Sequence, residues 1–101
     1  MRRPAIQIEH LSGPEDGKTV SFSKETVTIG RSNDCDICLA HDSTASRRHA
    51  RLVREGGRLF VEDTGSTHGT YVNGQRIQGR AELQPNCLLR IGHSWFRIAG
   101  Q

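Results

Sequence analysis

The sequence lacks any long apolar run. No stretch approaches the roughly 18 apolar residues that a membrane-spanning helix requires. The first three residues, Met-Arg-Arg, resemble the charged start of a signal peptide, but Pro4 and polar side chains between Gln7 and His10 interrupt the apolar region that would have to follow. We therefore expect a cytoplasmic protein that does not enter a membrane.

Cysteine is scarce, and its number is odd. Three cysteines argue against the disulfide framework of a small secreted domain. Cys35 and Cys38, followed by His41, have the spacing of a metal or redox motif. Zinc takes about four ligands, however, and Cys87 is the only cysteine left. Side chains three residues apart on a strand also point to opposite faces. We expect no metal and no cofactor, and we expect the cysteines to be small packing residues.

Aromatic residues are few, at 5% of the chain, and the basic residues are not gathered into one run. Proteins that bind nucleic acid commonly combine aromatic rings for base stacking with a concentrated basic surface. The formal net charge of +3 is compatible with an anionic partner but too small to identify one. We therefore do not expect nucleic acid to be the ligand.

The signatures of common catalytic sites are missing. The chain has no Gly-Lys-Ser/Thr phosphate-binding loop, no dinucleotide fingerprint and no Gly-x-Ser-x-Gly nucleophile elbow. Ser46, His49 and Asp63 contain the groups of a hydrolytic triad, which is the enzymatic alternative to be tested. We expect the protein not to be an enzyme.

Short alternating segments are abundant, whereas no helical apolar periodicity is sustained. Two turns are clear: Glu55-Gly56-Gly57, between two apolar segments, and Asn73-Gly74, whose residues readily adopt the positive φ angles of a two-residue hairpin. Strands are expected at residues 5–9, 19–22, 26–29, 50–54, 58–62, 71–72, 75–77, 87–91 and 95–98. The pattern predicts an all-β fold, a β-sandwich of two mostly antiparallel sheets, with a small barrel as the alternative.

Three polar clusters lie at strand ends or in adjoining loops. They are Gly30-Arg31, residues 46–50 (Ser-Arg-Arg-His-Ala) and residues 63–74 (Asp-Thr-Gly-Ser-Thr-His-Gly-Thr-Tyr-Val-Asn-Gly). They offer guanidinium groups, hydroxyls and loop amides, with no carboxylate clearly placed as a catalytic base. The planar fork of arginine matches phosphate, and hydroxyl groups donate further bonds to it. The clusters predict an oxyanion site formed by loops at one end of the sandwich.

In order and spacing, these motifs resemble those of the forkhead-associated (FHA) domain family of phosphothreonine-binding β-sandwiches. The matching segments are residues 29–31, 34–37, 46–50, 63–70 and 72–74, followed by Leu83, Ile91-Gly92 and Phe96. The similarity covers essentially the whole chain. It implies a single FHA-like phosphopeptide-binding domain over residues 1–101, and it leaves open that this domain is part of a longer protein.

The resemblance implies specific roles in binding. Arg31, Ser46, Arg47 and Thr67 would form the phosphothreonine-binding site, with Arg31 and Ser46 contacting the phosphate oxygens. His68 would contact the peptide backbone at a position where the family usually has asparagine. An imidazole cannot reproduce the paired donor and acceptor of an amide, so this contact is expected to differ from the family pattern.

Four residues would support the site structurally: Gly30, His49, Gly69 and Asn73. The two loop glycines are expected where the backbone needs a positive φ or a close approach. His49 is expected to bond loop backbone, because buried polar groups must find partners.

Other polar residues have plainer explanations. Asp63 and Ser66 are expected to organise their loop, since both types readily bond nearby amides. Asp34 is an alternative partner that would divert Arg31 from a ligand.

The hypothesis that follows is a phosphothreonine-dependent protein–protein interaction module in Ser/Thr kinase signalling. Its partner would be a phosphothreonine-containing protein that is a kinase substrate or itself a kinase. The alternative is a phosphate-independent docking or dimerisation module that uses a sheet face.

Overall fold

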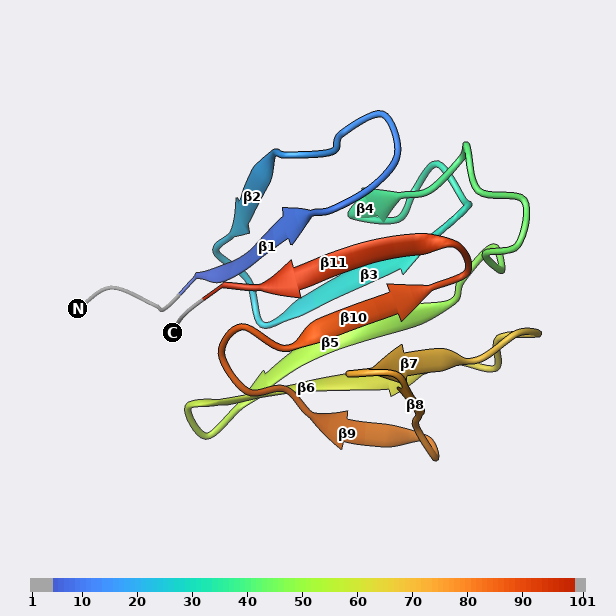
Figure 1. Ribbon diagram of the computed structural model, residues 1–101. Coiled ribbons are helices and arrows are strands. Elements are labelled where there is room, and N and C mark those ends of the chain that lie inside the picture. The colour runs from blue at the N-terminus through green and yellow to red at the C-terminus, as the bar shows by residue number, and fades with distance from the viewer. Residues whose placement is uncertain (1–4, 100–101) are drawn as a thin grey trace.

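The computed structural model describes residues 5–99 as two stacked β-sheets (Figure 1). The first sheet has the strand order β2–β1–β11–β10–β7–β8, and the second has the order β4–β3–β5–β6–β9. The first sheet contains β1 (Ile6–His10), β2 (Thr19–Phe22), β7 (Thr70–Val72), β8 (Gln75–Arg76), β10 (Leu88–Ile91) and β11 (Ser94–Ile98). The second contains β3 (Thr26–Gly30), β4 (Ile37–Cys38), β5 (Ala50–Glu55), β6 (Arg58–Asp63) and β9 (Arg80–Glu82). Within residues 5–99 there is no helix that could cross a membrane.

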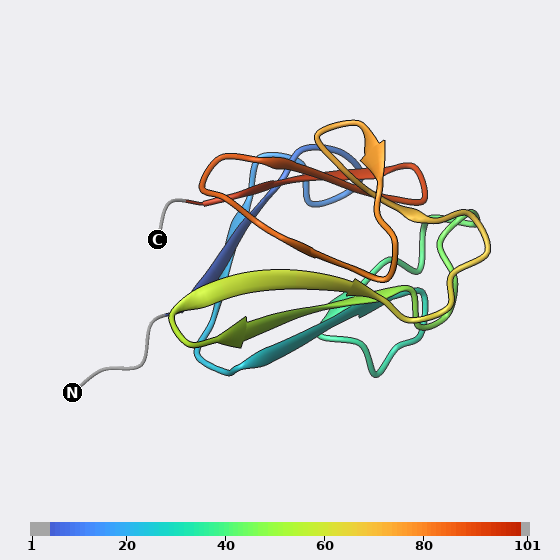
Figure 2. The same ribbon diagram turned by 90° about the horizontal axis from the view of Figure 1, so that it is seen from below.

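The core lies between the two sheets, which Figure 2 shows as separate layers. Strand pairs are antiparallel except for β3 and β4, which are parallel. The first sheet contributes Ile6, Ile8, Leu89, Ile91, Phe96 and Ile98 to the core, and the second contributes Val27, Ile29, Leu52 and Val61. Two separately hydrogen-bonded sheets around one core confirm the predicted β-sandwich and not the alternative closed barrel.

Both predicted turns are present, one with a correction. Asn73-Gly74 has φ angles of 50° and 84° and joins β7 to β8, as expected. The turn between β5 and β6 has only two residues, Gly56-Gly57, with φ angles of 56° and 77°. Glu55 is therefore part of the strand, where it pairs with Arg58. Two consecutive positive φ angles favour glycine and match the right-handed twist of the flanking strands.

Strand β9 (Arg80–Glu82) was not predicted from the sequence. Its residues Arg-Ala-Glu have low β-propensity, and the strand forms one edge of the second sheet. Tertiary contacts hold it: Arg80 lies over the ring of Phe60 on β6 at 4.0 Å, and Glu82 accepts hydrogen bonds from Arg58. These contacts depend on the neighbouring strand, so the local pattern could not reveal them.

One end of the sandwich gathers the polar loops (Figure 1). At this end Ile29 of β3 pairs with Ala50 of β5, and Ala50 pairs with Asp63 of β6. In the other sheet, Ile91 of β10 pairs with Thr70 of β7. The loop after β3, the loop before β5 and the loop from β6 to β7 therefore start or finish side by side, as the sequence predicted.

Candidate functional site

The loop after β3 and the loop before β5 are bonded through their backbones. The Arg31 amide donates to the Ser46 carbonyl at 3.0 Å, and the Ser32 amide donates to the Arg47 carbonyl at 3.1 Å. Gly30 makes this approach possible, because a Cβ at that position would collide with the Arg47 carbonyl oxygen. The glycine is needed here for close approach of two chains. Arg31, Ser46 and Arg47 are thereby placed next to one another.

His49 joins the loop before β5 to the loop after β6. Its side chain is fully buried, its Nδ1 accepts a hydrogen bond from the Ser46 amide at 3.0 Å, and its Nε2 lies 2.8 Å from the Gly69 carbonyl oxygen. Since Nδ1 is an acceptor, Nε2 carries the hydrogen and donates to Gly69. Both ring nitrogens of the imidazole are therefore bonded to loop backbone.

The Ser46 hydroxyl sits between two loops. Its Oγ accepts a hydrogen bond from the backbone amide of Thr67 at 3.1 Å, while the residue is half-buried. A hydroxyl group has one hydrogen to donate in addition to its lone pairs. Within residues 5–99 that hydrogen has no partner, so the Ser46 hydroxyl can donate one further hydrogen bond.

Asp63 organises the loop from β6 to β7. Its carboxylate accepts hydrogen bonds from the amides of Gly65 and Ser66, from the Ser66 hydroxyl and from the Thr70 hydroxyl. Burial alone would raise the pKa of Asp63, but these hydrogen bonds outweigh it and lower the pKa to about 2. The Ser66 hydroxyl in turn accepts from the Gly69 amide at 2.9 Å. The loop is therefore held by its own side chains.

The same hydrogen bonds argue against a hydrolytic triad of Ser46, His49 and Asp63. His49 Nδ1 accepts from the Ser46 backbone and not from its hydroxyl. Asp63 binds Ser66 and Thr70 and makes no bond to His49. A triad needs a nucleophile-to-base bond and a base-to-carboxylate bond, and these three residues form neither.

Arg31 and Arg47 provide unpaired positive charge at this end. Neither forms an ion pair with the described residues, and both are exposed. The Arg31 Nε donates to the Ala45 carbonyl, which fixes the guanidinium, and its two amino groups have no hydrogen-bond partner within residues 5–99. A shallow depression of about 250 Å³ lies between the two arginines, lined also by Ser32 and Asn33. Two arginines that line one depression can hold an oxyanion.

The alternative pairing of Arg31 with Asp34 does not form. Asp34 instead accepts from Arg48 Nη2 at 2.6 Å and from the Ser32 hydroxyl at 2.6 Å. Arg48 is thus neutralised by an exposed ion pair, while Arg31 is not.

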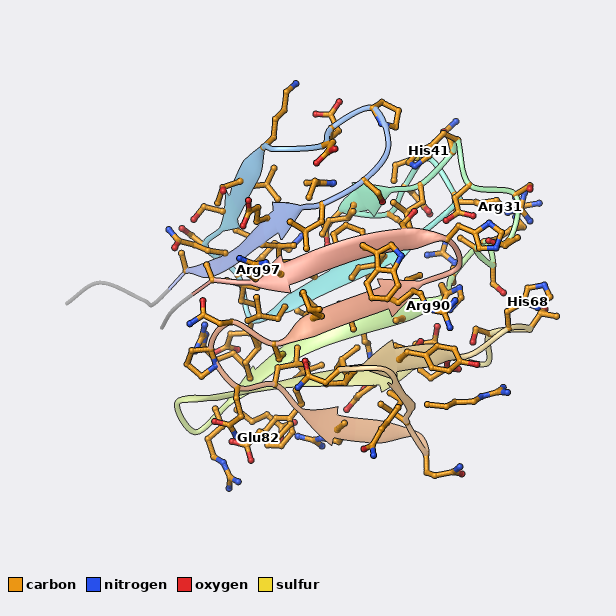
Figure 3. The ribbon with its side chains drawn as sticks, viewed as in Figure 1. Arg31, His41, His68, Glu82, Arg90 and Arg97 are labelled. Atoms are coloured by element: carbon orange, nitrogen blue, oxygen red, sulfur yellow. The ribbon has the colours of Figure 1, made fainter. Side chains whose placement is uncertain are left out.

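Thr67 and His68 are exposed on the loop from β6 to β7. Figure 3 shows His68 and Arg31 at the same end of the molecule, on different loops. Asn73 lies elsewhere, in the turn between β7 and β8. There its side-chain oxygen accepts from the Leu88 amide at 2.9 Å and its own amide donates to the Leu88 carbonyl at 2.8 Å, so it aligns β7 with β10.

Asp42 is a supporting residue that the sequence did not single out. It is buried and accepts from the His93 amide, the Ser94 hydroxyl and the Thr44 amide and hydroxyl. Burial works against ionisation, yet these bonds keep the pKa of Asp42 well below its usual range. They tie the segment leading to Ser46 to the turn between β10 and β11. The Asp-Ser-Thr run at residues 42–44 was the available signal, since such residues bond their own backbone.

Cys35 and Cys87 are buried, as expected of packing residues, whereas Cys38 is exposed, so that expectation is wrong for Cys38. Cys35 packs its sulfur 3.5 Å from the Arg47 carbonyl oxygen. In the described part of the chain, no three His, Cys, Asp or Glu side chains are grouped as metal ligands.

Comparison with known proteins shows which family the chain belongs to. The family model of the FHA domain matches residues 27–92. The FHA domain-containing protein FhaB of Mycobacterium tuberculosis is 38% identical over 96% of this chain, and the chain spans 62% of the length of that relative.

Two solved structures are similar over nearly the whole chain. One, from a structural and functional study of phosphothreonine-dependent FHA domain interactions, has a TM-score of 0.84 and 27% identity, and covers 96% of this chain and 97% of its own. The other is EmbR of Mycobacterium tuberculosis in complex with a low-affinity phosphopeptide, with a TM-score of 0.84 and 25% identity. It covers 97% of this chain and 25% of its own.

Proposed function

Since the chain belongs to the FHA domain family, we propose that it is a phosphothreonine-dependent interaction module in Ser/Thr kinase signalling. FHA domains are interaction modules and not a known family of enzymes. One observation carries the proposal: Arg31 and Arg47 lack carboxylate partners within residues 5–99 and line one depression. The backbone of Arg31 is bonded to that of Ser46, whose hydroxyl hydrogen has no partner within the same residues. A dianionic phosphate fits this combination of donors.

The phosphate would lie between the loop after β3 and the loop before β5. The amino groups of Arg31 would bind two phosphate oxygens as a fork, because the bond from Nε to the Ala45 carbonyl already orients the guanidinium. Ser46 would donate its hydroxyl to a third oxygen, and Arg47 would add charge and contact the peptide backbone.

The remaining contacts would come from the loop between β6 and β7. Thr67, whose amide is bonded to Ser46 Oγ, would line the side of the phosphothreonine pocket. His68, exposed beside it, would contact the ligand main chain through one imidazole nitrogen. Gly30, His49 and Gly69 would act indirectly by fixing the three loops.

The partner would be a phosphothreonine-containing protein, either a kinase or its substrate. The neighbouring solved structures support this class of ligand, since one was determined with a phosphopeptide and another in a study of phosphothreonine-dependent interactions. We further propose that the encounter takes place in the cytoplasm, where Ser/Thr kinases act, and that residues 1–101 are one domain.

A degenerate phosphothreonine peptide array, followed by calorimetric titration of the best peptide, tests the proposal. We expect saturable binding of the phosphorylated peptide and none of its unphosphorylated counterpart. Equal binding of both peptides would reject the proposal in favour of phosphate-independent docking.

A further inference from the structure

A row of alternating arginine and aromatic side chains crosses four strands of the first sheet. Arg76 of β8 pairs with Tyr71 of β7, Tyr71 pairs with Arg90 of β10, and Arg90 pairs with Trp95 of β11. Residues opposite one another on antiparallel strands share a face. This is the outer face, because residues that alternate with them, such as Phe96, are buried. These four residues are called the aromatic–arginine row.

The middle of the row is packed together. The Cζ atom of Arg90 lies 4.1 Å from the centroid of the Tyr71 ring and 5.7 Å from that of Trp95. Its Nη1 donates to the Gly92 carbonyl at 3.3 Å. Figure 3 shows Arg90 toward the end of the molecule at which Arg31 and His68 lie. Stacking on aromatic rings orders the guanidinium but leaves its charge without a counter-ion.

The row carries positive charges that have no acidic partner among the described residues, and apolar surface that these residues leave exposed. Neither Arg76 nor Arg90 forms an ion pair with residues 5–99, whereas Arg58 and Arg80 do. The register places Glu9 on the same face, but opposite Arg97 and not Trp95. Trp95 is 38% exposed and is the one exposed large hydrophobic side chain in this part of the chain. Tryptophan, tyrosine and arginine are the residues that dominate binding energy at interfaces.

The row is continuous with the proposed phosphothreonine site. The Arg76 side chain lies against Gly69, where an added Cβ would be 2.5 Å from Nε. Gly69 directly follows His68 in the loop between β6 and β7. From β8 to β11 the row measures about 14 Å at the usual strand spacing. An extended segment of about five residues covers that length.

We propose that the aromatic–arginine row binds an acidic segment flanking the phosphothreonine in the same partner protein. The inference rests on the proposed function. Carboxylates of the segment pair with Arg76 and Arg90, and its backbone and aliphatic stems pack on Tyr71 and Trp95. The positive row and the anionic segment are complementary, and the segment leaves the pocket beside His68 and crosses the sheet toward β11.

Five phosphothreonine peptides test the inference: a short core peptide, the core with a five-residue glutamate-rich extension on either side, and both extensions with glutamine in place of glutamate. We expect the glutamate extension on one side to bind about three- to tenfold tighter than its glutamine counterpart. This gain should shrink as salt rises, since the row is exposed.

Variants of the protein show which residues produce the tighter binding of the glutamate-extended peptide, called the gain. Arg90→Gln and Trp95→Ala should each abolish the gain while binding the core peptide as the unmodified protein does. Arg97→Gln is the matched control, because it removes the same charge from the same face outside the row, and it should keep the gain. Thermal unfolding of each variant verifies that it is folded.

Three results would overturn the inference. The first is equal affinity for glutamate and glutamine extensions on both sides, and the second is a gain that survives in Arg90→Gln. The third is single-stranded oligonucleotide binding as tight as that of the acidic peptide and lost in Trp95→Ala, which would assign the row to nucleic acid. In all three cases the proposed function still holds if the core peptide binds tightly. If the core peptide does not bind, both the proposed function and the inference are rejected.

Discussion

The backbone amide of Thr67 donates a hydrogen bond to the Ser46 hydroxyl oxygen at 3.1 Å. The two residues are 21 positions apart in sequence and lie on different loops. The bond orients the hydroxyl so that its hydrogen remains for a ligand. The pair thus links the geometry of the two loops to the proposed phosphate site in a single contact.

Replacing Ser46 with alanine removes both the donor and the bond to Thr67. We expect Ser46→Ala to weaken phosphopeptide binding by about 1–2 kcal/mol, since a neutral hydroxyl donates one bond to the anion. Calorimetric titration measures the loss. A Ser46→Ala protein with full affinity would place the phosphate elsewhere.

Loss of Arg31 should be more severe. A charge-assisted hydrogen bond contributes roughly 1.5–3 kcal/mol, so losing a forked pair in Arg31→Ala should lower affinity at least about tenfold to a hundredfold. Arg48→Ala is the control, because Arg48 is exposed and paired with Asp34. Titrations should show a much lower phosphopeptide affinity for Arg31→Ala than for Arg48→Ala, while the two variants have equal melting temperatures. Similar losses in both would indicate a diffuse electrostatic effect.

His49 should affect stability more than affinity. His49→Ala leaves the Ser46 amide and the Gly69 carbonyl without their buried partner, and we expect unfolding to become easier by about 2–4 kcal/mol. Denaturant titration gives this value, and peptide binding is measured well below the transition. A variant that unfolds normally but cannot bind would make His49 a ligand contact.

The proposed pocket should prefer phosphothreonine over phosphoserine. The two differ by one methyl group, and a fitted apolar recess gains roughly 1–3 kcal/mol from such a group. We expect at least about tenfold tighter binding of phosphothreonine, equivalent to about 1.4 kcal/mol. Paired titrations at two salt concentrations test this. Equal affinities that collapse together with rising salt contradict a shaped pocket.

Acid should loosen the loop between β6 and β7. The folded-state pKa of Asp63 is about 2, below the ordinary 3.8. The ionised Asp63 carboxylate therefore adds to the free energy of unfolding above pH 3.8, and this contribution is lost as pH falls toward 2. Because Asp63 is partly exposed, about 1–2 kcal/mol is expected. The unfolding free energies of the original protein and of Asp63→Asn should converge between pH 5 and pH 2, as measured by denaturant titration at each pH. Parallel pH profiles would show that the carboxylate is not responsible.

The sequence predicted the sandwich well where side-chain alternation was strong. β1 and β11 alternate between buried and exposed positions along their length, so the period of two was visible without a structure. β9 was missed because its stability comes from Arg80 on Phe60 and from the contact between Arg58 and Glu82. Such contacts between separate strands leave no local pattern.

The candidate site was predictable in composition but not in its internal bonds. The sequence could not decide whether Asp34 would pair with Arg31 or with Arg48, because the outcome depends on how two loops fold against each other. Asp42 was missed for the same reason, as two of its partners, His93 and Ser94, are more than 50 residues away. The roles of Arg31, Ser46, Arg47, Thr67 and His68 in binding remain predictions.

The buried bridge of His49 between two loops has a kinetic consequence. The loops are already fixed before a ligand arrives, so little ordering has to accompany binding. Association should then be a single fast step, with a rate set by diffusion and by the charge of the peptide. Differences in affinity among ligands should therefore lie mainly in residence time.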